Sequence, residues 1–198
     1  SYDLVIMEIE SFETLLERYG RDKCETFARS IVTNITSRIG QILIGRVEDS
    51  QIALLVKHVS FEEHKKFMEY CMLADYESPI RNAVVNCGIY PKIEREANMN
   101  NVLKFAAVPL TKLRNHYGLY VAEFDDEMRN KVEHQAFIVD SAKKAIEEKE
   151  FKVYYQPKFD PESQCVGGAE ALVRWIHPEI GFLSPADFIP LLEANGFI

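Results

Sequence analysis

The order of strand-like and helix-like segments along the first 124 residues is the strongest constraint on the fold. Residues 4–9 form a short apolar run rich in β-branched residues, which is typical of a buried strand. Two helical segments follow, and residues 41–47 and 51–58 then flank three polar residues, which predicts a β-hairpin. A helix, a strand, a helix interrupted by Pro109 and a last strand are predicted over residues 60–73, 83–90, 102–114 and 119–124. This order, β-α-α-β-β-α-β-α-β, favours one α/β domain built on a central sheet with flanking helices.

The residues after 125 have a different character. Asp125 and Asp126 are suited to start a long, highly charged helix over residues 127–149, whose positions Val132, Ala136, Val139 and Lys143 predict one stripe that packs on a neighbour. Two strands, at 151–157 and 165–175, and a helix over 185–194 follow. We therefore expect a domain over residues 1–125, a connector helix over 126–150, and a third segment over 151–198.

Charge and composition exclude several functions. The chain has 23 Lys and Arg residues against 31 Asp and Glu residues, a net charge of −8, so it is not suited to bind nucleic acid polymers or anionic membranes. It has no apolar run of the ~20 residues that span a bilayer. The absence of such a run and the acidic residues of the first segment predict a cytoplasmic location. The four cysteines are scattered without a CxxC pair, which predicts reduced structural thiols.

A dense set of motifs covers residues 154–198. It comprises Gln156-Pro157, Glu170-Ala171-Leu172, Arg174-Trp175, His177-Pro178, Gly181, Ser184-Pro185 and Phe188-Ile189-Pro190. This constellation resembles the opening of the EAL domain, a (β/α)8 barrel phosphodiesterase that linearises cyclic di-GMP in bacteria. The segment is long enough for only the first hairpin and helix of such a barrel.

The resemblance implies roles for four residues. Glu170 is expected to bind Mg²⁺ or Mn²⁺, and Gln156, Leu172 and Arg174 are expected to contact cyclic di-GMP. The chemistry agrees with these roles, because a carboxylate is a hard ligand for such metals and a guanidinium four residues further along the strand lies on the same face. Without the resemblance, a surface ion pair between Glu170 and Arg174 would explain these residues as well as a binding site does.

A second set of motifs lies in the first 125 residues and comprises Met7-Glu8-Ile9-Glu10-Ser11-Phe12, Tyr19-Gly20 and Asn86-Cys87-Gly88. This set resembles the GGDEF domain, the fold of diguanylate cyclases, and its first segment is similar to that family's first strand. The predicted hairpin carries Glu48-Asp49-Ser50-Gln51-Ile52 where the family has its signature. The expected fold is therefore a mostly antiparallel sheet with helices on its faces.

The signature of this chain departs from that of active cyclases. Glu48 and Asp49 replace two glycines that let the backbone approach the GTP phosphates, and they add two negative charges there. Ser50 replaces a metal-binding acid, while Leu16 and Glu25 replace a guanine-contacting Asn and Asp. Glu8 stands at a vestigial metal position, where the sequence favours a solvated or hydrogen-bonded strand-end acid over a metal ligand.

Two hypotheses about function follow from these resemblances. In the first, a catalytically inactive GGDEF-like regulatory module precedes an EAL domain whose parent protein hydrolyses cyclic di-GMP to linear pGpG. In the second, both domains are degenerate and the protein is a non-catalytic cyclic di-GMP receptor or scaffold. We expect neither a bound cofactor nor a complete catalytic site in this chain itself. The sequence leaves open two further partners, GTP bound without turnover and a second copy of the chain.

Overall fold

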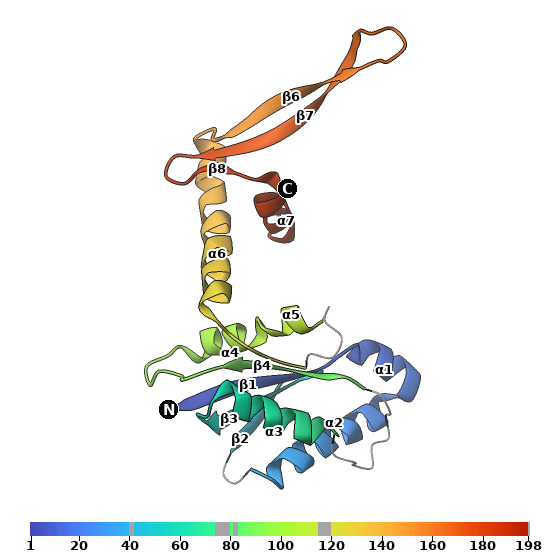
Figure 1. Ribbon diagram of the computed structural model, residues 1–198, viewed down its shortest axis with the longest axis vertical. Coiled ribbons are helices and arrows are strands. Elements are labelled where there is room, and N and C mark those ends of the chain that lie inside the picture. Colours follow the sequence, from blue (N-terminus) through green and yellow to red (C-terminus); the bar gives the residue numbers. More distant parts are fainter. Residues whose placement is uncertain (40–41, 74–79, 81–82, 115–119, 198) are drawn as a thin grey trace. The chain divides into compact units, whose positions relative to one another are not determined.

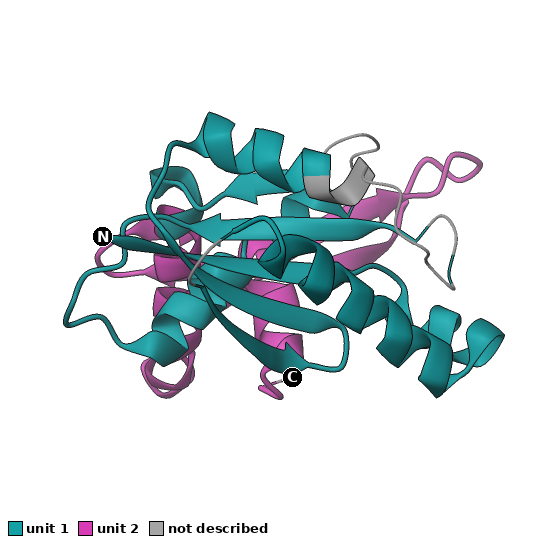
Figure 2. Cartoon of the chain, turned by 90° about the horizontal axis from the view of Figure 1, so that it is seen from below, with its two compact units in different colours: residues 1–129 teal, residues 130–198 magenta. Residues whose placement is uncertain are grey.

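The computed structural model describes residues 1–39, 42–73, 80, 83–114 and 120–197. The expected strand ends at Gln41 and Leu119, the terminal Ile198 and the side chain of Cys71 lie outside this part of the chain. The chain divides into two compact units, residues 1–129 and 130–198, which Figure 2 distinguishes by colour.

The first unit contains the predicted sequence of elements. These are β1 (Tyr2–Ile9), α1 (Phe12–Tyr19), α2 (Arg21–Thr36), β2 (Leu43–Glu48), β3 (Gln51–Lys57), α3 (Phe61–Leu73), β4 (Val85–Tyr90), α4 (Met99–Ala107), α5 (Leu110–Leu113) and β5 (Val121–Glu123). The break between α4 and α5 falls at Pro109, which lacks an N–H group and caps the second helix. The five strands form one sheet in the order β2-β3-β1-β4-β5, antiparallel except for the parallel pair β4 and β5. The expected fold class is confirmed.

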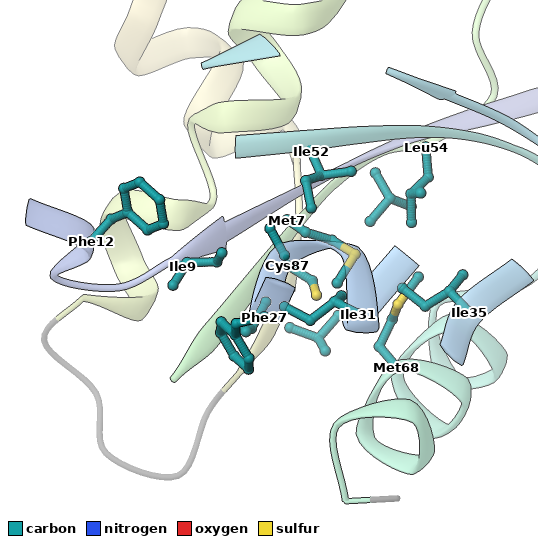
Figure 3. Packing of buried hydrophobic residues seen from close by; sticks show 14 of the residues in the cluster. Met7, Ile9, Phe12, Phe27, Ile31, Ile35, Ile52, Leu54, Met68 and Cys87 are labelled. Atoms are coloured by element: carbon teal, nitrogen blue, oxygen red, sulfur yellow. The ribbon is translucent and has the colours of Figure 1, made fainter. Parts of the chain in front are cut away.

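Alternation along β1 sends its side chains to two different cores. Val5, Met7 and Ile9 face the larger core, which is closed by α1, α2 and α3. Figure 3 shows Met7 and Cys87 of the sheet beside Phe27 of α2 in this core.

The other face of the sheet packs against α4 and α5, on the opposite side from α1 to α3 in Figure 1. Leu4 and Ile6 lie in this second core, and Glu8 continues the same alternation at the end of the strand. Gly88 on β4 permits close packing here, because a Cβ at this position would collide with the backbone oxygen of Ala106 in α4.

The second unit is built on α6 (Asp126–Glu147), β6 (Phe151–Phe159), β7 (Val166–His177), β8 (Gly181–Leu183) and α7 (Pro185–Ala194). Asp125 caps α6, since its Oδ1 accepts a 2.7 Å hydrogen bond from the backbone N–H of Met128. The three strands form an antiparallel sheet in the order β6-β7-β8, so this segment does not close a barrel. The short strand β8 was not predicted.

The expected stripe on α6 is wrong. Ala136 and Lys143 are exposed, whereas Ile138, Ala142 and Ala145 are buried in a small core. The core also contains Trp175, Leu183, Phe188 and Leu192, which come from the sheet and from α7. Trp175 lies at its centre, with its ring 4.8 Å from Phe151 and 5.5 Å from Phe188 between centroids.

The free cysteines of the described side chains differ in environment. Cys24 and Cys87 are buried in the larger core of the first unit, as expected of structural thiols. Cys165 is exposed in the β6–β7 hairpin, so it has no packing role. No helix of the described part of the chain is both long and apolar enough to cross a bilayer.

Candidate functional site

The signature hairpin turns through Asp49 and Ser50, between the paired residues Glu48 and Gln51. Arg46 braces this turn by donating hydrogen bonds to the backbone oxygen of Asp49 at 2.6 Å and to that of Glu48 at 3.4 Å. The same guanidinium donates a 2.6 Å hydrogen bond to Oε2 of Glu25 on α2. This contact holds the pKa of the Glu25 carboxyl below its usual value and raises that of Arg46.

The hairpin turn borders a pocket of 740 Å³ at the end of β1. Five carboxylates line it, those of Glu8, Glu10, Glu13, Glu48 and Asp49. Ser50 and Leu16 also lie in its wall, and Arg114 is the one basic residue among the described lining residues. An anionic triphosphate would meet repulsion from most of this wall.

Glu8 is the key residue of this pocket because it is only 7% exposed and carries a charge. Arg114, at the end of α5, donates to both of its carboxylate oxygens, from Nη2 at 2.7 Å and from Nε at 3.1 Å. Gln51, directly opposite on β3, donates a third hydrogen bond at 3.0 Å. The bond to Glu8 raises the pKa of Arg114, so the guanidinium remains charged.

These contacts test whether the pocket suits a cyclase-type metal. Both oxygens of Glu8 already accept hydrogen bonds, and the neighbouring signature residue Ser50 supplies a neutral hydroxyl instead of a second carboxylate. Mg²⁺ requires several oxygen ligands in near-octahedral geometry. The residues present do not fit this metal.

The four residues singled out in the second unit meet on one face of the β6–β7 hairpin. Gln156 stands directly opposite Glu170, and Leu172 and Arg174 follow at two-residue steps along the same face. Tyr154 faces Leu172 and Lys152 faces Arg174, so these two residues belong to the same face. They were not predicted from the sequence, although the two-residue alternation along β6 places both on the face of Gln156.

Side chains on this face differ in exposure: Gln156 and Glu170 are exposed, whereas Leu172 and Arg174 are partly buried. Glu170 is paired with Lys158 at 3.3 Å, with both side chains more than half exposed, so the contact is weakly stabilising. Arg174 donates a 2.8 Å hydrogen bond to the backbone oxygen of Val173. Within the described residues, no three His, Cys, Asp or Glu side chains are grouped so that they could hold a metal ion.

Two of the motif residues in this unit have structural roles. The indole Nε1 of Trp175 donates a 2.8 Å hydrogen bond to Glu150, while its ring fills the core. His177 Nδ1 accepts hydrogen bonds from the backbone N–H groups of Glu179 and Ile180, which fixes the turn into β8.

A second polar cluster lies at the start of β1, at the other end of the sheet from the pocket. The carboxylate of Asp3 is fully buried and contacts the imidazoles of His64 and His58. Burial raises the pKa of the Asp3 carboxyl, but hydrogen bonds from His64, Lys92 and His58 together hold it below its usual value. Burial raises the pKa of the nearby Glu123 carboxyl, and the negative charge of Asp3 raises it further.

Comparison with solved structures defines the class of the first unit. A GGEEF domain of a diguanylate cyclase from Vibrio cholerae, described as active, superposes with a TM-score of 0.53 at 15% identity, covering 63% of this chain and 83% of that one. A Vibrio cholerae LapD structure with S helix, GGDEF and EAL parts, bound to c-di-GMP, has a TM-score of 0.55 at 14% identity. It covers 98% of this chain and 47% of that chain. The first unit therefore has a GGDEF-like fold.

The second unit is assigned by sequence. Residues 139–198 match the family model described as the EAL domain. The curated phosphodiesterase PdeL of Escherichia coli is 46% identical over 54 residues, 27% of this chain and 15% of that protein. A GGDEF-like fold is thus followed by part of an EAL domain, as the sequence predicted.

Relatives that match the whole chain are longer. The bifunctional diguanylate cyclase and cyclic di-GMP phosphodiesterase MucR of Pseudomonas aeruginosa is 22% identical over 206 residues, which is 100% of this chain and 30% of that protein. The chain spans between 24% and 30% of the length of such relatives.

Proposed function

We propose that this chain is part of a cytoplasmic bacterial protein of cyclic di-GMP signalling. In this protein a GGDEF-like unit without cyclase activity precedes an EAL domain that hydrolyses cyclic di-GMP to linear pGpG. The observation that carries the proposal is the register of β6 and β7, which gathers Gln156, Glu170, Leu172 and Arg174 on one face of the hairpin. The curated relatives named above, a phosphodiesterase and a bifunctional cyclase and phosphodiesterase, support the substrate.

Each residue on this face suits a part of the dinucleotide. The guanidinium of Arg174 is suited to a phosphate, the amide of Gln156 to polar groups, and Leu172 to apolar contact. Glu170 supplies one carboxylate to a Mg²⁺ or Mn²⁺ ion, which when bound would activate water and polarise the phosphate. One carboxylate does not complete such a site, so the other ligands are assigned to further strands of the EAL barrel.

The GGDEF-like unit is proposed to be a regulatory module. Its signature places Glu48 and Asp49 beside the pocket, where they repel a triphosphate, and it offers Ser50 where a metal-binding acid is needed. The contact of Arg114 with Glu8 further opposes metal binding.

The activity is tested in the full-length protein with cyclic di-GMP and Mn²⁺, by following pGpG. Glu170→Gln should lower turnover by at least about 100-fold, because it removes a charged metal ligand of nearly the same shape. Glu162→Gln, in the exposed turn of the same hairpin, is the matched control and should keep full activity. Unchanged turnover in Glu170→Gln would contradict the proposal.

Measuring the binding of cyclic di-GMP beside the formation of pGpG distinguishes a phosphodiesterase from a non-catalytic receptor. The ion pair of Lys158 with Glu170 is the observation that favours it, since the carboxylate already has a cationic partner. Tight binding of cyclic di-GMP by the wild-type protein with no pGpG formed would support a non-catalytic receptor.

A further inference from the structure

The ion pair of Glu8 with Arg114 suggests that a guanidinium replaces a metal ion in the pocket of the first unit. The resemblance to cyclases implies two acids that share a divalent cation, one at Glu8 and one in the signature. Here the signature acid is Ser50, and a guanidinium with a single positive charge faces the remaining acid. One carboxylate and one guanidinium are neutral together, as two carboxylates and a divalent cation would be.

We propose that Arg114 acts as an internal cation that occupies the position of the lost metal and keeps Glu8 closed to cations. This inference rests on the proposed absence of cyclase function and explains how the pocket is kept inactive. The two bonds from Arg114 take one lone-pair direction on each oxygen of Glu8, and Gln51 takes another.

The fold brings Arg114 and Glu8 together. Alternation along β1 turns Glu8 to the face covered by α4 and α5, and Arg114 follows the last residue of α5. Because Glu8 is 7% exposed, its charge requires a partner within the protein. Arg114 meets this requirement at every physiological pH, since a guanidinium does not lose its proton.

Restoring the missing acid tests the proposal. Ser50 lines the same pocket as Glu8, so Ser50→Glu adds a carboxylate at the signature position, beside the five already in the pocket wall. The proposal predicts that Ser50→Glu alone does not create a Mn²⁺ site, because Arg114 pairs with the acids. Ser50→Glu combined with Arg114→Gln should bind Mn²⁺ at least about ten-fold more tightly than Ser50→Glu alone.

The measurement is the electron paramagnetic resonance signal of free Mn²⁺ during titration with each variant of the chain, after thermal melting has shown that each is folded. Lys112→Gln in the Ser50→Glu background is the matched control, because Lys112 lies on α5 and pairs with Asp125. This control should not increase Mn²⁺ binding.

Two results would overturn the proposal. One is equal Mn²⁺ affinity of Ser50→Glu with and without Arg114, and the other is a folded double variant that binds no Mn²⁺. If the double variant does not fold, Arg114→Lys replaces Arg114→Gln. A lysine cannot form the bidentate contact with both carboxylate oxygens of Glu8, so this variant should still bind Mn²⁺ more tightly than Ser50→Glu alone. The experiment uses neither GTP nor turnover, so its outcome is separate from the test of cyclase activity.

Discussion

The buried carboxylate of Asp3 is 2.6 Å from Nε2 of His64, across the end of the sheet where β1 begins. An ionised carboxylate only accepts hydrogen bonds, so the imidazole donates. The backbone N–H of Lys92 donates a second bond at 2.7 Å, and His58 lies at 2.9 Å. Asp3 therefore joins β1 to α3 and to the segment that follows β4.

Replacing Asp3 by Asn should destabilise the chain by about 3 kcal/mol, because the imidazoles lose their charged acceptor inside the protein. Urea unfolding at pH 7 measures this difference. Glu17→Gln, an exposed change on α1, is the control and should alter stability little. A loss as small as that of the control would show that Asp3 is not a stabilising centre.

The contribution of Asp3 should also depend on pH. Its pKa is lowered in the folded chain, so the unfolded state binds a proton first as the pH falls. The stability that Asp3 adds is fully present above the unfolded carboxyl pKa of about 3.9 and is lost as the pH falls through the lower folded value. The urea midpoints of wild type and Asp3→Asn should therefore draw closer as the pH falls below the unfolded carboxyl pKa of about 3.9, whereas a constant difference down to pH 2 would contradict this.

Gly88 should not tolerate a methyl group. Gly88→Ala forces β4 and the backbone of Ala106 apart and is expected to cost about 2–3 kcal/mol. Gly45→Ala, on β2 of the same sheet, meets no atom within 4 Å and should be nearly neutral. Thermal melting of the two variants compares them directly, and equal melting temperatures would refute the close approach of α4.

The buried face of α6 is testable with the single tryptophan of the chain. Ala142→Asp places a charge in the core around Trp175 and should unfold the second unit, with a red shift of tryptophan fluorescence. Ala136→Asp, on the exposed side of the helix, should leave the emission unchanged. If both variants shift the emission equally, the assignment of the buried face is wrong.

Local patterns predicted most of the fold. The apolar run of β1, the polar turn at Asp49 and the break at Pro109 each depend on neighbouring residues, so periodicity and turn chemistry were sufficient. The three-residue strand β8 was missed because Gly181–Leu183 is too short to show a period. The stripe on α6 was wrong because spacing alone did not reveal which apolar positions meet the core around Trp175.

The candidate site was predictable only in part. The motif residues of the EAL segment were recognised, but their placement opposite one another required the register of β6 and β7. Arg114 is separated from Glu8 by 106 positions, and no local pattern links residues so far apart. Similarly, a lone Asp3 beside an apolar run and two distant histidines gave no sign that they would meet.

The most direct test of the account is incubation of the purified 198-residue chain with GTP and Mn²⁺, with chromatographic detection of cyclic di-GMP. Glu48, Asp49 and Ser50 oppose triphosphate and metal binding, so the account predicts that no cyclic di-GMP forms above the enzyme-free control. Catalytic turnover of GTP to cyclic di-GMP would contradict it.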